Sequence, residues 1–583
     1  MQLLHLAIPH FRNLRGVTMD FATQLEHMPG DSVDEPFKRI RSHALIGQNG
    51  VGKSNLIEAL ITIFRDVDLD RDAAFGYTLA YSIRGNVVKI HADTATQKRP
   101  FVWVNGQVQS QGHLLKNREL LPSHIFAYYS GRNERIEALF QEHQRRFNRR
   151  QEIVAEEVLP AELLRNFTGS EADIRAIEAA KNREQNLLRK LGDDRLRRLF
   201  YCRGGHSQLV LLACLLSNDP VFQKVLKNLH IESLESALFV LKEPHRLREK
   251  RRNGRFDENE INEGDPRFWY ARGNVVSEFL DKLWKVAWAP IEQEATKQID
   301  FRGRTEVQRQ LYLFVPNHEK LKQLGAMVGG PDSFFRYAEG AYIGDLIDEV
   351  RITVKKRDEH GGKVSFTRLS EGELQMLTVL GLMRITREDH CLFLLDEPDT
   401  HLNPIWKLRY FDDIEGVLGS EEGALEQGES QILIATHDPM MVGSLKREQV
   451  HILHREGNLT VVEVPDEHPQ GMGVTGLLKS DLFGLSSTLD VETERRLFRR
   501  NELYVKSPRT PEEDAELKRL SAELADLGFS TADFRDPDYA LFVRKMAQHR
   551  QFRKPTLTPE ERAEQDRIAD EVIEDILRED KNK

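Results

Sequence analysis

Eight residues near the N-terminus have the types and spacing of a phosphate-binding loop. The stretch GQNGVGKS, Gly47 to Ser54, fits the pattern G-x-x-x-x-G-K-[ST] at every fixed position, between the apolar run HALIG and the helical pattern SNLIEALITIF. Glycines let backbone N–H groups curl around phosphate oxygens without a Cβ in the way. The lysine of this pattern bridges the β- and γ-phosphates, and the hydroxyl after it ligates Mg²⁺. The pattern predicts a nucleoside triphosphate site that uses Lys53 and Ser54.

Two later segments supply carboxylates and an imidazole. LFLLDEP ends an apolar run with Asp396 and Glu397, and QILIATHD places His437 just after another. Such runs are typical of buried parallel strands, whose carboxyl ends bind ligands. We predict that Asp396 belongs to the Mg²⁺ shell, that Glu397 is the general base for an attacking water, and that His437 reaches the γ-phosphate. By itself, a histidine at a strand end is more often structural.

The stretch TRLSEGELQML, Thr367 to Leu377, has two interpretations. Ser370 and Glu373 have the S-x-x-E spacing of a capping box, which would only start a helix. The same helix N-terminus and serine hydroxyl suit a phosphate, because the N-terminal end of a helix carries partial positive charge. Taken alone, the stretch favours the capping box, which is the commoner feature.

Bulk properties limit the class of protein. The chain has 583 residues, which a length of about 150 residues per domain divides into roughly three or four units. A formal net charge of −10 argues against a protein that is basic overall, although a local basic face stays open. Cys202, Cys214 and Cys391 have no metal-ligand spacing, so we expect neither a zinc site nor disulfides.

We expect a cytoplasmic protein without a membrane span. His5, His10 and Arg12 interrupt the first apolar residues before the core of a secretory signal forms. The longest apolar candidate, LVLLACLL from Leu209 to Leu216, is far shorter than the roughly 18 to 20 residues that cross a bilayer. It predicts a buried helix.

The order of predicted elements indicates an α/β fold with a mixed sheet. Strand patterns precede and follow the phosphate loop, and Asn105-Gly106 is typical of a hairpin turn. From about 134 to 341 we predict helices, with no sustained heptad, hence a compact helical module. Strands resume at VRITVKK and KVSFTRL around a predicted hairpin at 358–362, and the chain turns helical again after about 481. Thr510 and Thr558 each begin a capping box with proline at the first helical position.

The order of these motifs resembles the ABC-type ATPase head. The signature LSEGE, Leu369 to Glu373, looks like that of RecF and SMC proteins, and so does the turn FRNL, Phe11 to Leu14. The stretch DEPDTHLNP, Asp396 to Pro404, resembles the bacterial branch that contains the overcoming-lysogenization-defect (OLD) nucleases and anti-phage ATPases. The resemblance implies an N-terminal head lobe over 1–135, a helical insertion over 136–341, a C-terminal head lobe over 342–480 and a helical extension over 481–583.

The resemblance also implies a set of nucleotide contacts. Ser370 would cap its helix and point that helix at the γ-phosphate of ATP bound to a second head, so the working unit should be a homodimer or a higher homo-oligomer. Catalysis falls to Glu397, His437 and Lys53, and Mg²⁺ to Ser54 and Asp396. The implied ATP contacts are Arg12, Asn13, Gly47, Gln48, Asn49, Gly50, Val51, Gly52, Lys53, Ser54, Asn55, Ser370, Gly372 and Glu373.

One feature departs from the family pattern. Such heads carry a glutamine after the strand that follows the phosphate-loop helix, and the matching place here reads AYYSGRNER. Ser130, Asn133 or a water would have to take its place beside the metal. For Arg12 and Asn13, an ordinary strand turn is an equal alternative to a nucleotide contact.

Basic clusters suggest contact with DNA or another nucleic acid, because phosphate contacts need only a local stripe of positive charge. A solvated helix face is the commoner explanation for any single cluster. The clusters comprise Arg145, Arg146, Arg149 and Arg150; Arg246, Arg248, Lys250, Arg251, Arg252 and Arg255; and Arg499, Arg500, Arg544, Lys545, Arg550, Arg553 and Lys554.

A nuclease within the same chain is not indicated. The single D-x-D after His437, at Asp536 to Asp538, contains a proline and reads as a turn, and there is no HNH arrangement. The pattern resembles the ATPase of Septu-type and retron-associated defence systems (PtuA-like), which works with a separate HNH-type nuclease. Two alternatives stay open: a RecF-like DNA-repair ATPase, and a nucleotide-gated scaffold with slow or no hydrolysis.

Overall fold

The chain forms two compact units, Met1–Gln470 and Gly471–Lys583. The computed structural model describes residues 1–21, 23–24, 37–38, 40–110, 112–131, 133–151, 198–202, 205–254, 261–262, 264–298, 303, 305–357, 362–385, 390–418, 430–485, 488–527, 564–565, 567–569 and 571. The predicted hairpin at 358–362 lies largely outside these residues, and the capping box at Thr558 and the Asp536–Asp538 turn lie wholly outside them.

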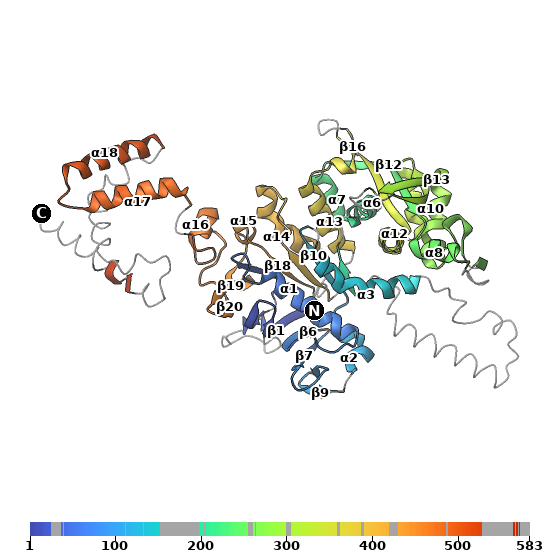
Figure 1. Ribbon diagram of the computed structural model, residues 1–583, viewed down its shortest axis with the longest axis horizontal. Coiled ribbons are helices and arrows are strands. Elements are labelled where there is room, and N and C mark those ends of the chain that lie inside the picture. The colour runs from blue at the N-terminus through green and yellow to red at the C-terminus, as the bar shows by residue number, and fades with distance from the viewer. Residues whose placement is uncertain are drawn as a thin grey trace. The chain divides into compact units, whose positions relative to one another are not determined.

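A seven-stranded sheet lies at the centre of the first unit, in the order β11-β10-β17-β18-β5-β19-β20 (Figure 1). Neighbouring strands pair in parallel, except β19 and β20, so the predicted mixed sheet is confirmed. Every residue of β17 and β18 is buried, as expected for strands covered on both faces. The strands are β5 (Ser42–Gly47), β10 (Ile125–Tyr129), β11 (Leu199–Tyr201), β17 (Leu392–Asp396), β18 (Gln431–Ala435), β19 (Val450–Glu456) and β20 (Leu459–Glu463).

A six-stranded antiparallel sheet, ordered β2-β1-β6-β7-β8-β9, shares one hydrophobic core with α1 (Lys53–Asp68) and the central sheet. Asn105 and Gly106 turn between β8 and β9 with φ values of 51° and 80°, which confirms the predicted hairpin. The strands are β1 (Gln2–Phe11), β2 (Leu14–Asp20), β6 (Tyr77–Ile83), β7 (Asn86–Ala92), β8 (Phe101–Val104) and β9 (Gln107–Gln109); β3 (Thr23–Gln24) and β4 (Phe37–Lys38) pair separately.

The segment predicted to be a helical insertion contains long strands as well as helices. A five-stranded antiparallel sheet, β13-β14-β12-β15-β16, takes three of its strands from that segment, so the prediction of helices throughout 134–341 is wrong there. The strands are β12 (Ile231–Lys242), β13 (Trp288–Gln298), β14 (Thr305–Val315), β15 (Ile347–Lys356) and β16 (Lys363–Ser365). We call the part from α6 to α12, with this sheet, the insert.

Helices of the insert pack against the head. Helix α6 is buried, as predicted from its apolar run, and lies against α12 and α13. A Cβ on Gly381 of α13 would lie 2.3 Å from Val210 Cγ1, so only glycine allows α6 this close. The helices are α2 (His113–Lys116), α3 (Glu134–Gln151), α6 (His206–Leu216), α7 (Pro220–Asn228), α8 (His245–Arg252), α10 (Asp281–Val286), α11 (His318–Val328), α12 (Pro331–Ile343), α13 (Glu371–Ile385), α14 (Pro404–Leu418) and α15 (Pro439–Val442).

Short helical turns complete the first unit: 3-10 turns at Arg118–Leu120, Pro266–Phe268, Phe366–Arg368 and Arg447–Gln449, and a π-helical turn at Val275–Leu280. The second unit contains α16 (Gly473–Lys479), α17 (Val491–Val505) and α18 (Pro511–Asp526), and the predicted capping box at Thr510 is present. Among the described residues no single helix has the length and apolarity to cross a membrane; the bent pair α6 and α7, at 119°, passes on length and composition alone.

Candidate nucleotide site

The phosphate loop joins β5 to α1, and two of its glycines, Gly47 and Gly52, lie in close contact with neighbouring residues. Gly47 has φ 146°, and a Cβ there would lie 2.2 Å from the carbonyl oxygen of Leu453. Gly52 has φ 121°, and its Cβ would lie 2.4 Å from Leu14 Cδ2. Both positions therefore exclude other residues on two grounds, backbone conformation and space. Gln48, Asn49 and Gly50 are exposed, so the loop is open to solvent.

Lys53 points back into this loop. Its Nζ donates hydrogen bonds to the carbonyl oxygens of Gly47, at 2.7 Å, and Gln48, at 3.4 Å. Burial lowers the pKa of Lys53, while the carboxylates of Glu397 and Asp396 act in the opposite direction. The ammonium group thus lies between the loop and the carboxylate pair, where a phosphate would exchange for the loop carbonyls as its partner.

Asp396, at the end of β17, is 1% exposed. Burial raises its pKa to about 6, against the opposing effects of the nearby Ser54 hydroxyl and the Lys53 ammonium. Neither carboxylate oxygen has a well-formed hydrogen bond within the described part of the chain. A buried carboxylate without partners beside a hydroxyl fits the oxygen donor set that Mg²⁺ prefers.

Glu397 and His437 face each other across the ends of β17 and β18. Glu397 Oε1 lies 3.1 Å from His437 Nδ1, and the side chains are 38% and 53% exposed. Glu397 has φ 49°, in the left-handed region, and its N–H donates to the Ala435 carbonyl at 2.8 Å. Left-handed backbone at a non-glycine residue carries strain, which is common at functional sites. The strained turn directs the carboxylate out of the sheet toward solvent.

The signature stretch forms the predicted capping box. The Glu373 N–H donates to Ser370 Oγ at 3.2 Å, and the Ser370 N–H donates to Glu373 Oε2 at 2.8 Å. Partial burial alone would raise the pKa of Glu373, but hydrogen bonds from Lys356 and Ser370 lower it overall. Glu373 therefore stays ionised and holds the start of α13 in place.

The signature also packs against the loop after the carboxylate pair. A Cβ on Gly372 would lie 2.5 Å from the carbonyl oxygen of His401, so this contact needs glycine. The His401 N–H donates to the side chain of Gln375 at 3.3 Å. Asp399, in the same loop, is buried and accepts a hydrogen bond from Thr436 Oγ1 at 3.2 Å. The signature and this loop thus form one surface element.

The turn at Arg12 and Asn13 lies against the phosphate loop. Asn13 Nδ2 donates to the Gly50 carbonyl at 2.8 Å, and Asn55 Nδ2 donates to Asn13 Oδ1 at 2.6 Å. Arg12 forms an ion pair, at 2.5 Å, with Glu58, whose side chain is 2% exposed. Asn13 and Asn55 therefore brace the loop, and Arg12 is held beside it by a buried carboxylate.

The sequence analysis missed the group that holds α3 to α1. Arg135 of α3 forms an ion pair at 3.0 Å with Glu58, and His143 of the same helix contacts Asp68 at 2.9 Å. The hydrogen bond from His143, and the Arg198 charge, overcome the effect of burial and lower the pKa of Asp68. A charged residue between the apolar Ile57 and Ala59 was the available signal for Glu58.

The place of the missing glutamine is occupied by Ser130 and Asn133. The Ser130 N–H donates to the Asp396 carbonyl at 3.1 Å, which places it next to the carboxylate pair. Asn133 Oδ1 accepts from the Ile136 N–H at 3.2 Å and so caps α3. Of the two, Ser130 is the one that adjoins the carboxylates.

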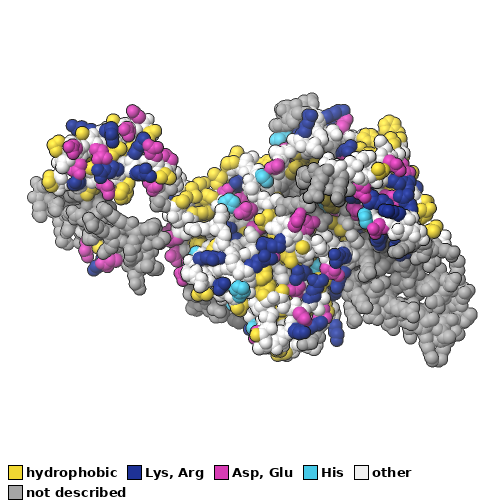
Figure 2. All heavy atoms as spheres, in the orientation of Figure 1, with side chains coloured by type: hydrophobic (Ala, Val, Ile, Leu, Met, Phe, Trp, Pro, Cys, Tyr) yellow, Lys and Arg dark blue, Asp and Glu magenta, His cyan; other side chains and the backbone are white. Residues whose placement is uncertain are grey.

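Two of the predicted basic clusters meet at one cavity of the first unit. Arg145, Arg146 and Arg246 line one cavity of the first unit, and Figure 2 shows Lys and Arg side chains gathered over α8. Arg248 and Arg251 form ion pairs with Glu306 and Glu243. Arg499 pairs with Glu516 and Arg500 is buried. The remaining cluster members are Lys250 and Arg252, which lie on α8, and Arg149, Arg150, Arg255, Arg544, Lys545, Arg550, Arg553 and Lys554, whose side chains lie outside the described residues.

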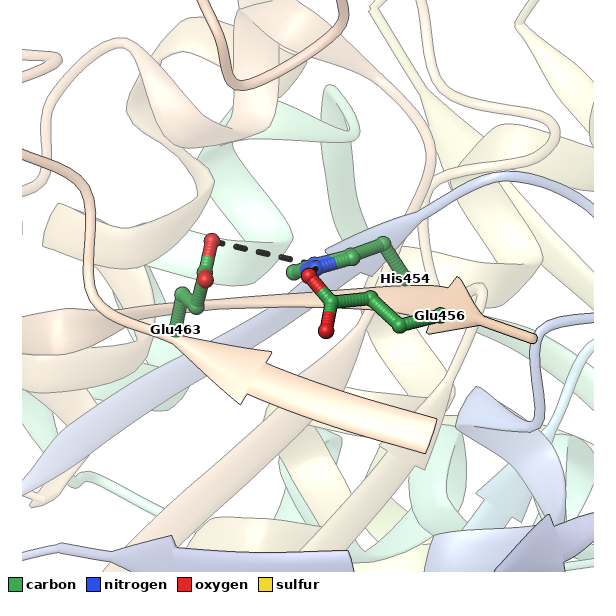
Figure 3. Close-up of side chains that lie close together, drawn as sticks. All are labelled: His454, Glu456 and Glu463. Atoms are coloured by element: carbon green, nitrogen blue, oxygen red, sulfur yellow. Dashed lines mark ion pairs between the residues drawn. The ribbon is translucent and has the colours of Figure 1, made fainter. Parts of the chain in front are cut away.

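A second group of possible metal ligands lies on the β19–β20 hairpin. His454, Glu456 and Glu463 lie on one face, with ligand atoms within 4.8 Å of one another (Figure 3). His454 Nε2 lies 3.5 Å from Glu456, and Nδ1 lies 3.8 Å from Glu463. The two imidazole nitrogens thus face different carboxylates, as in an ion-paired histidine on an exposed sheet face.

Comparisons with known proteins bear on the fold. Residues 232–442 match the family described as "AAA domain, putative AbiEii toxin, Type IV TA system". This match includes the signature, Asp396, Glu397 and His437, and it leaves out the phosphate loop. No curated protein matches the chain.

The chain also matches solved structures at low sequence identity. The Smc head domain bound to the C-terminal domain of ScpA, from Pyrococcus furiosus, is 12% identical, with TM-score 0.29, covering 79% of this chain and 96% of that one. The SMC head domain from Thermotoga maritima is 11% identical, with TM-score 0.28, and the match covers 80% of this chain and 99% of that one. The recombination mediator protein RecF, in the structure named RecF-ATPrS, is 12% identical, with TM-score 0.28, and the match covers 79% of this chain and 97% of that one. These overall superpositions are poor, and the function proposed below rests on the site.

The strand order, the loop between β5 and α1, and the carboxylates at the end of β17 define an α/β P-loop ATPase fold. The insertion predicted for this chain is present, but it contains three long strands in addition to its helices.

Proposed function

We propose that the protein binds and hydrolyses ATP as a head that works in pairs. The observation that carries this proposal is the position of Asp396, Glu397 and His437 at the ends of adjacent parallel strands, beside the lysine of a phosphate loop. Lys53 would hold the β- and γ-phosphates, and Ser54 with Asp396 would hold Mg²⁺. When bound, Mg²⁺ neutralises charge that develops on the phosphate oxygens.

Glu397 is the general base in this mechanism. Its exposed carboxylate accepts a proton from water, and the oxygen of that water then attacks the γ-phosphorus as the bond to the β,γ-bridging oxygen breaks. His437, 3.1 Å from Glu397, keeps the carboxylate directed toward the water and donates toward the γ-phosphate. Products are ADP and inorganic phosphate.

The surface around the signature supports the proposed pairing of two heads. Ser370 and Glu371 are exposed, and the hydrogen bonds of Ser370 within the described part of the chain are made inside the signature itself. Ile405 and Leu408, one turn apart on α14 beside the loop at His401, are 67% and 49% exposed. Apolar residues left exposed beside a helix N-terminus suit a second head whose nucleotide the signature would meet.

We further propose that this head senses or clamps nucleic acid and controls a separate HNH-type nuclease in anti-phage defence. The stretch DEPDTHLNP and the arginines that the fold gathers at one cavity support this role. A nucleotide-gated scaffold with slow hydrolysis is the second candidate, because no glutamine occupies the place of Ser130 and Asn133.

The test is ATP turnover and oligomer mass for the parent protein and for Glu397→Gln. We expect the parent to hydrolyse ATP, and the variant to lose turnover while it traps an ATP-dependent dimer or larger assembly. Glu319→Gln, at an exposed position of α11, is the matched control and should behave as the parent. If neither protein turns ATP over but both assemble with it, the scaffold is correct and the catalytic roles are wrong.

The trapped assembly also tests the wider role. Purified with the products of neighbouring genes, it should retain a nuclease subunit. Turnover stimulated by DNA without any nuclease subunit would instead favour a RecF-like repair ATPase.

A further inference from the structure

A cavity of about 720 Å³ opens between α3, α8, the segment 270–275 and the C-terminal end of α12. Its volume lies within the range of small-molecule sites, roughly 300 to 1,000 Å³. Four arginines line it: Arg145, Arg146, Arg246 and Arg272. They come from three segments that are far apart in sequence, so the fold alone concentrates this charge.

The carboxylates of the cavity leave positive charge in excess. Glu142 is shared between Arg145, at 3.7 Å, and Arg146, at 3.5 Å. Asp345 is engaged by Lys242, which does not line the cavity, at 2.7 Å. One carboxylate therefore serves two guanidinium groups, and the other is neutralised from outside.

Two of the other arginines of α8, Arg248 and Arg251, are held in ion pairs away from the cavity lining. Arg251 binds both carboxylate oxygens of the buried Glu243, at 2.8 and 2.7 Å, and Arg248 pairs with Glu306. Arg246 is exposed and lines the cavity. The N-terminus of α8 also lies at the cavity. It has no side-chain cap, so the partial positive charge of the helix N-terminus adds to that of the arginines.

The remaining wall suits a flat ring. Tyr270 lines the cavity next to apolar side chains that include Leu247 and Val275. Trp269 and Tyr270 have φ values of 55° and 62°, two consecutive bulky residues in the left-handed region. Such backbone persists only where surrounding contacts impose it, and it is common at ligand sites. Here the Asp265–Ala271 bridge and the Tyr270 N–H to Asp265 hydrogen bond impose it.

We propose that this cavity binds a phosphate-bearing group of nucleotide size. Guanidinium groups match phosphate through paired N–H donors, and an aromatic and apolar wall next to them suits a base or sugar. The group would be a free nucleotide or the phosphorylated end of a nucleic-acid strand. For the strand end, the inference rests on the nucleic-acid recognition proposed above; it does not depend on ATP hydrolysis.

The experiment uses the full chain with Lys53→Ala, so that the head does not compete for phosphate. The probes are a 12-nucleotide strand with a 5′-phosphate and a 3′-fluorophore, the same strand with a 5′-hydroxyl, and AMP. We expect the 5′-phosphate to strengthen binding about tenfold or more, because hydrogen bonds to charged groups contribute roughly 1.5–3 kcal/mol. The double variant Arg145→Glu, Arg246→Glu should remove that preference.

Both substituted side chains are exposed, so the fold should tolerate their replacement, and thermal unfolding checks this. Arg351→Glu, on an exposed face of β15, is the matched charge control and should bind as the parent does. The same arginine substitutions in a chain with intact Lys53 should leave ATP turnover unchanged.

The outcomes separate the two sources and the two proposals. If AMP binds and the arginine variants abolish this, while the 5′-phosphate has no effect, the ligand is a free nucleotide. If both strands bind equally and the arginine variants change the binding of neither strand nor of AMP, nucleic-acid recognition lies elsewhere and the cavity proposal falls. If neither strand nor AMP binds the Lys53→Ala chain with its arginines intact, the cavity proposal is wrong. If AMP binds that chain but neither strand does, only the nucleic-acid role is contradicted.

Discussion

The nucleotide site and the arginine cavity are built in opposite ways. The proposed phosphate-binding part of the first is one continuous stretch, Gly47 to Ser54, in which a Cβ on Gly47 would collide with the backbone. The cavity takes its arginines from α3, α8 and the segment after Tyr270, and no two of these segments adjoin in sequence. A site encoded by one stretch can be predicted from its spacing, whereas an assembled site becomes visible only when the fold is known.

The largest expected effect separates the two sites outright. Lys53→Ala removes the ammonium group that lies against the phosphate loop and is proposed to hold the phosphates, so ATP affinity and turnover should fall by about 10²-fold or more. Binding of a phosphorylated strand at the arginine cavity should not change. Equilibrium binding of a fluorescent ATP analogue measures the first effect, with Lys116→Ala as control; unchanged turnover in Lys53→Ala would contradict the site.

A pair of glycine substitutions tests how strictly the continuous stretch is encoded. Gly47→Ala places a Cβ 2.2 Å from a backbone oxygen at φ 146°, and should cost about 3 kcal/mol or more of unfolding free energy along with ATP binding. Gly50→Ala meets nothing within 4 Å, at φ 80°, and should cost only about 1 kcal/mol. Urea unfolding compares them, and equal losses would show that space at Gly47 is not the constraint.

The contact between α3 and α1 is the next target, since it lies between the two sites. Asp68→Asn leaves His143 and Arg198 without their buried carboxylate and should reduce the unfolding free energy by about 3 kcal/mol. Asp70→Asn, which removes only an exposed pair with Arg99, should cost less than about 1 kcal/mol. Chemical denaturation of both variants provides the measurement, and a cost for Asp68→Asn as small as that for Asp70→Asn would show that the buried pair does not hold α3.

Acid should weaken the strands beneath the phosphate loop. His43 of β5 and His451 of β19 are buried with Nδ1 and Nε2 3.0 Å apart, and burial lowers both pKa values, that of His451 to about 4. The unfolded chain therefore binds more protons between pH 6.5 and 4, so the free energy of unfolding decreases by about 1.4 kcal/mol per imidazole for each unit that the pH is lowered. Urea midpoints at pH 7.5, 6 and 5 measure this; a slope that His451→Phe leaves unchanged would assign it elsewhere.

The smallest effect concerns the basic cluster of the second unit. Arg499→Ala removes surface ion pairs with Glu516 and Glu502 and should leave the urea midpoint nearly unchanged. It should not change affinity for either strand, because this guanidinium is already paired. A loss comparable to that of the arginine cavity variant would move nucleic-acid binding to the second unit.

The sequence predicted the strands that carry chemistry because they are buried on both faces. Leu392–Asp396 and Gln431–Ala435 are unbroken apolar runs, and their charged ends are easy to recognise. Strand β13, Trp288–Gln298, could not be found in this way because it lies at the edge of its sheet and is rich in Glu, Gln and Lys. These residue types are as common in helices as in exposed strands, so the sequence favours neither. Strand β14 did contain a signal, the alternation of buried Leu311, Leu313 and Val315.

The same contrast holds for the contacts of Arg12. Its place in a strand turn next to the phosphate loop was readable from FRNL, and its φ of 54° fits a turn. Its partner, Glu58, is buried within α1 and appears in the sequence only as one charged residue on an apolar face. Side-chain partners depend on which faces the fold brings together, and local patterns do not contain that information.

Helix α3 belongs to both sites. Arg135 and His143 tie it to the helix of the phosphate loop, and Arg145 and Arg146, one turn or less beyond His143, reach the arginine cavity. At 1.5 Å per residue, roughly 16 Å of helix separates Arg135 from Arg146. Any ligand that displaces α3 acts on two equilibria, and linkage then requires reciprocity: the factor by which the cavity ligand changes ATP affinity equals the factor by which ATP changes affinity for that ligand.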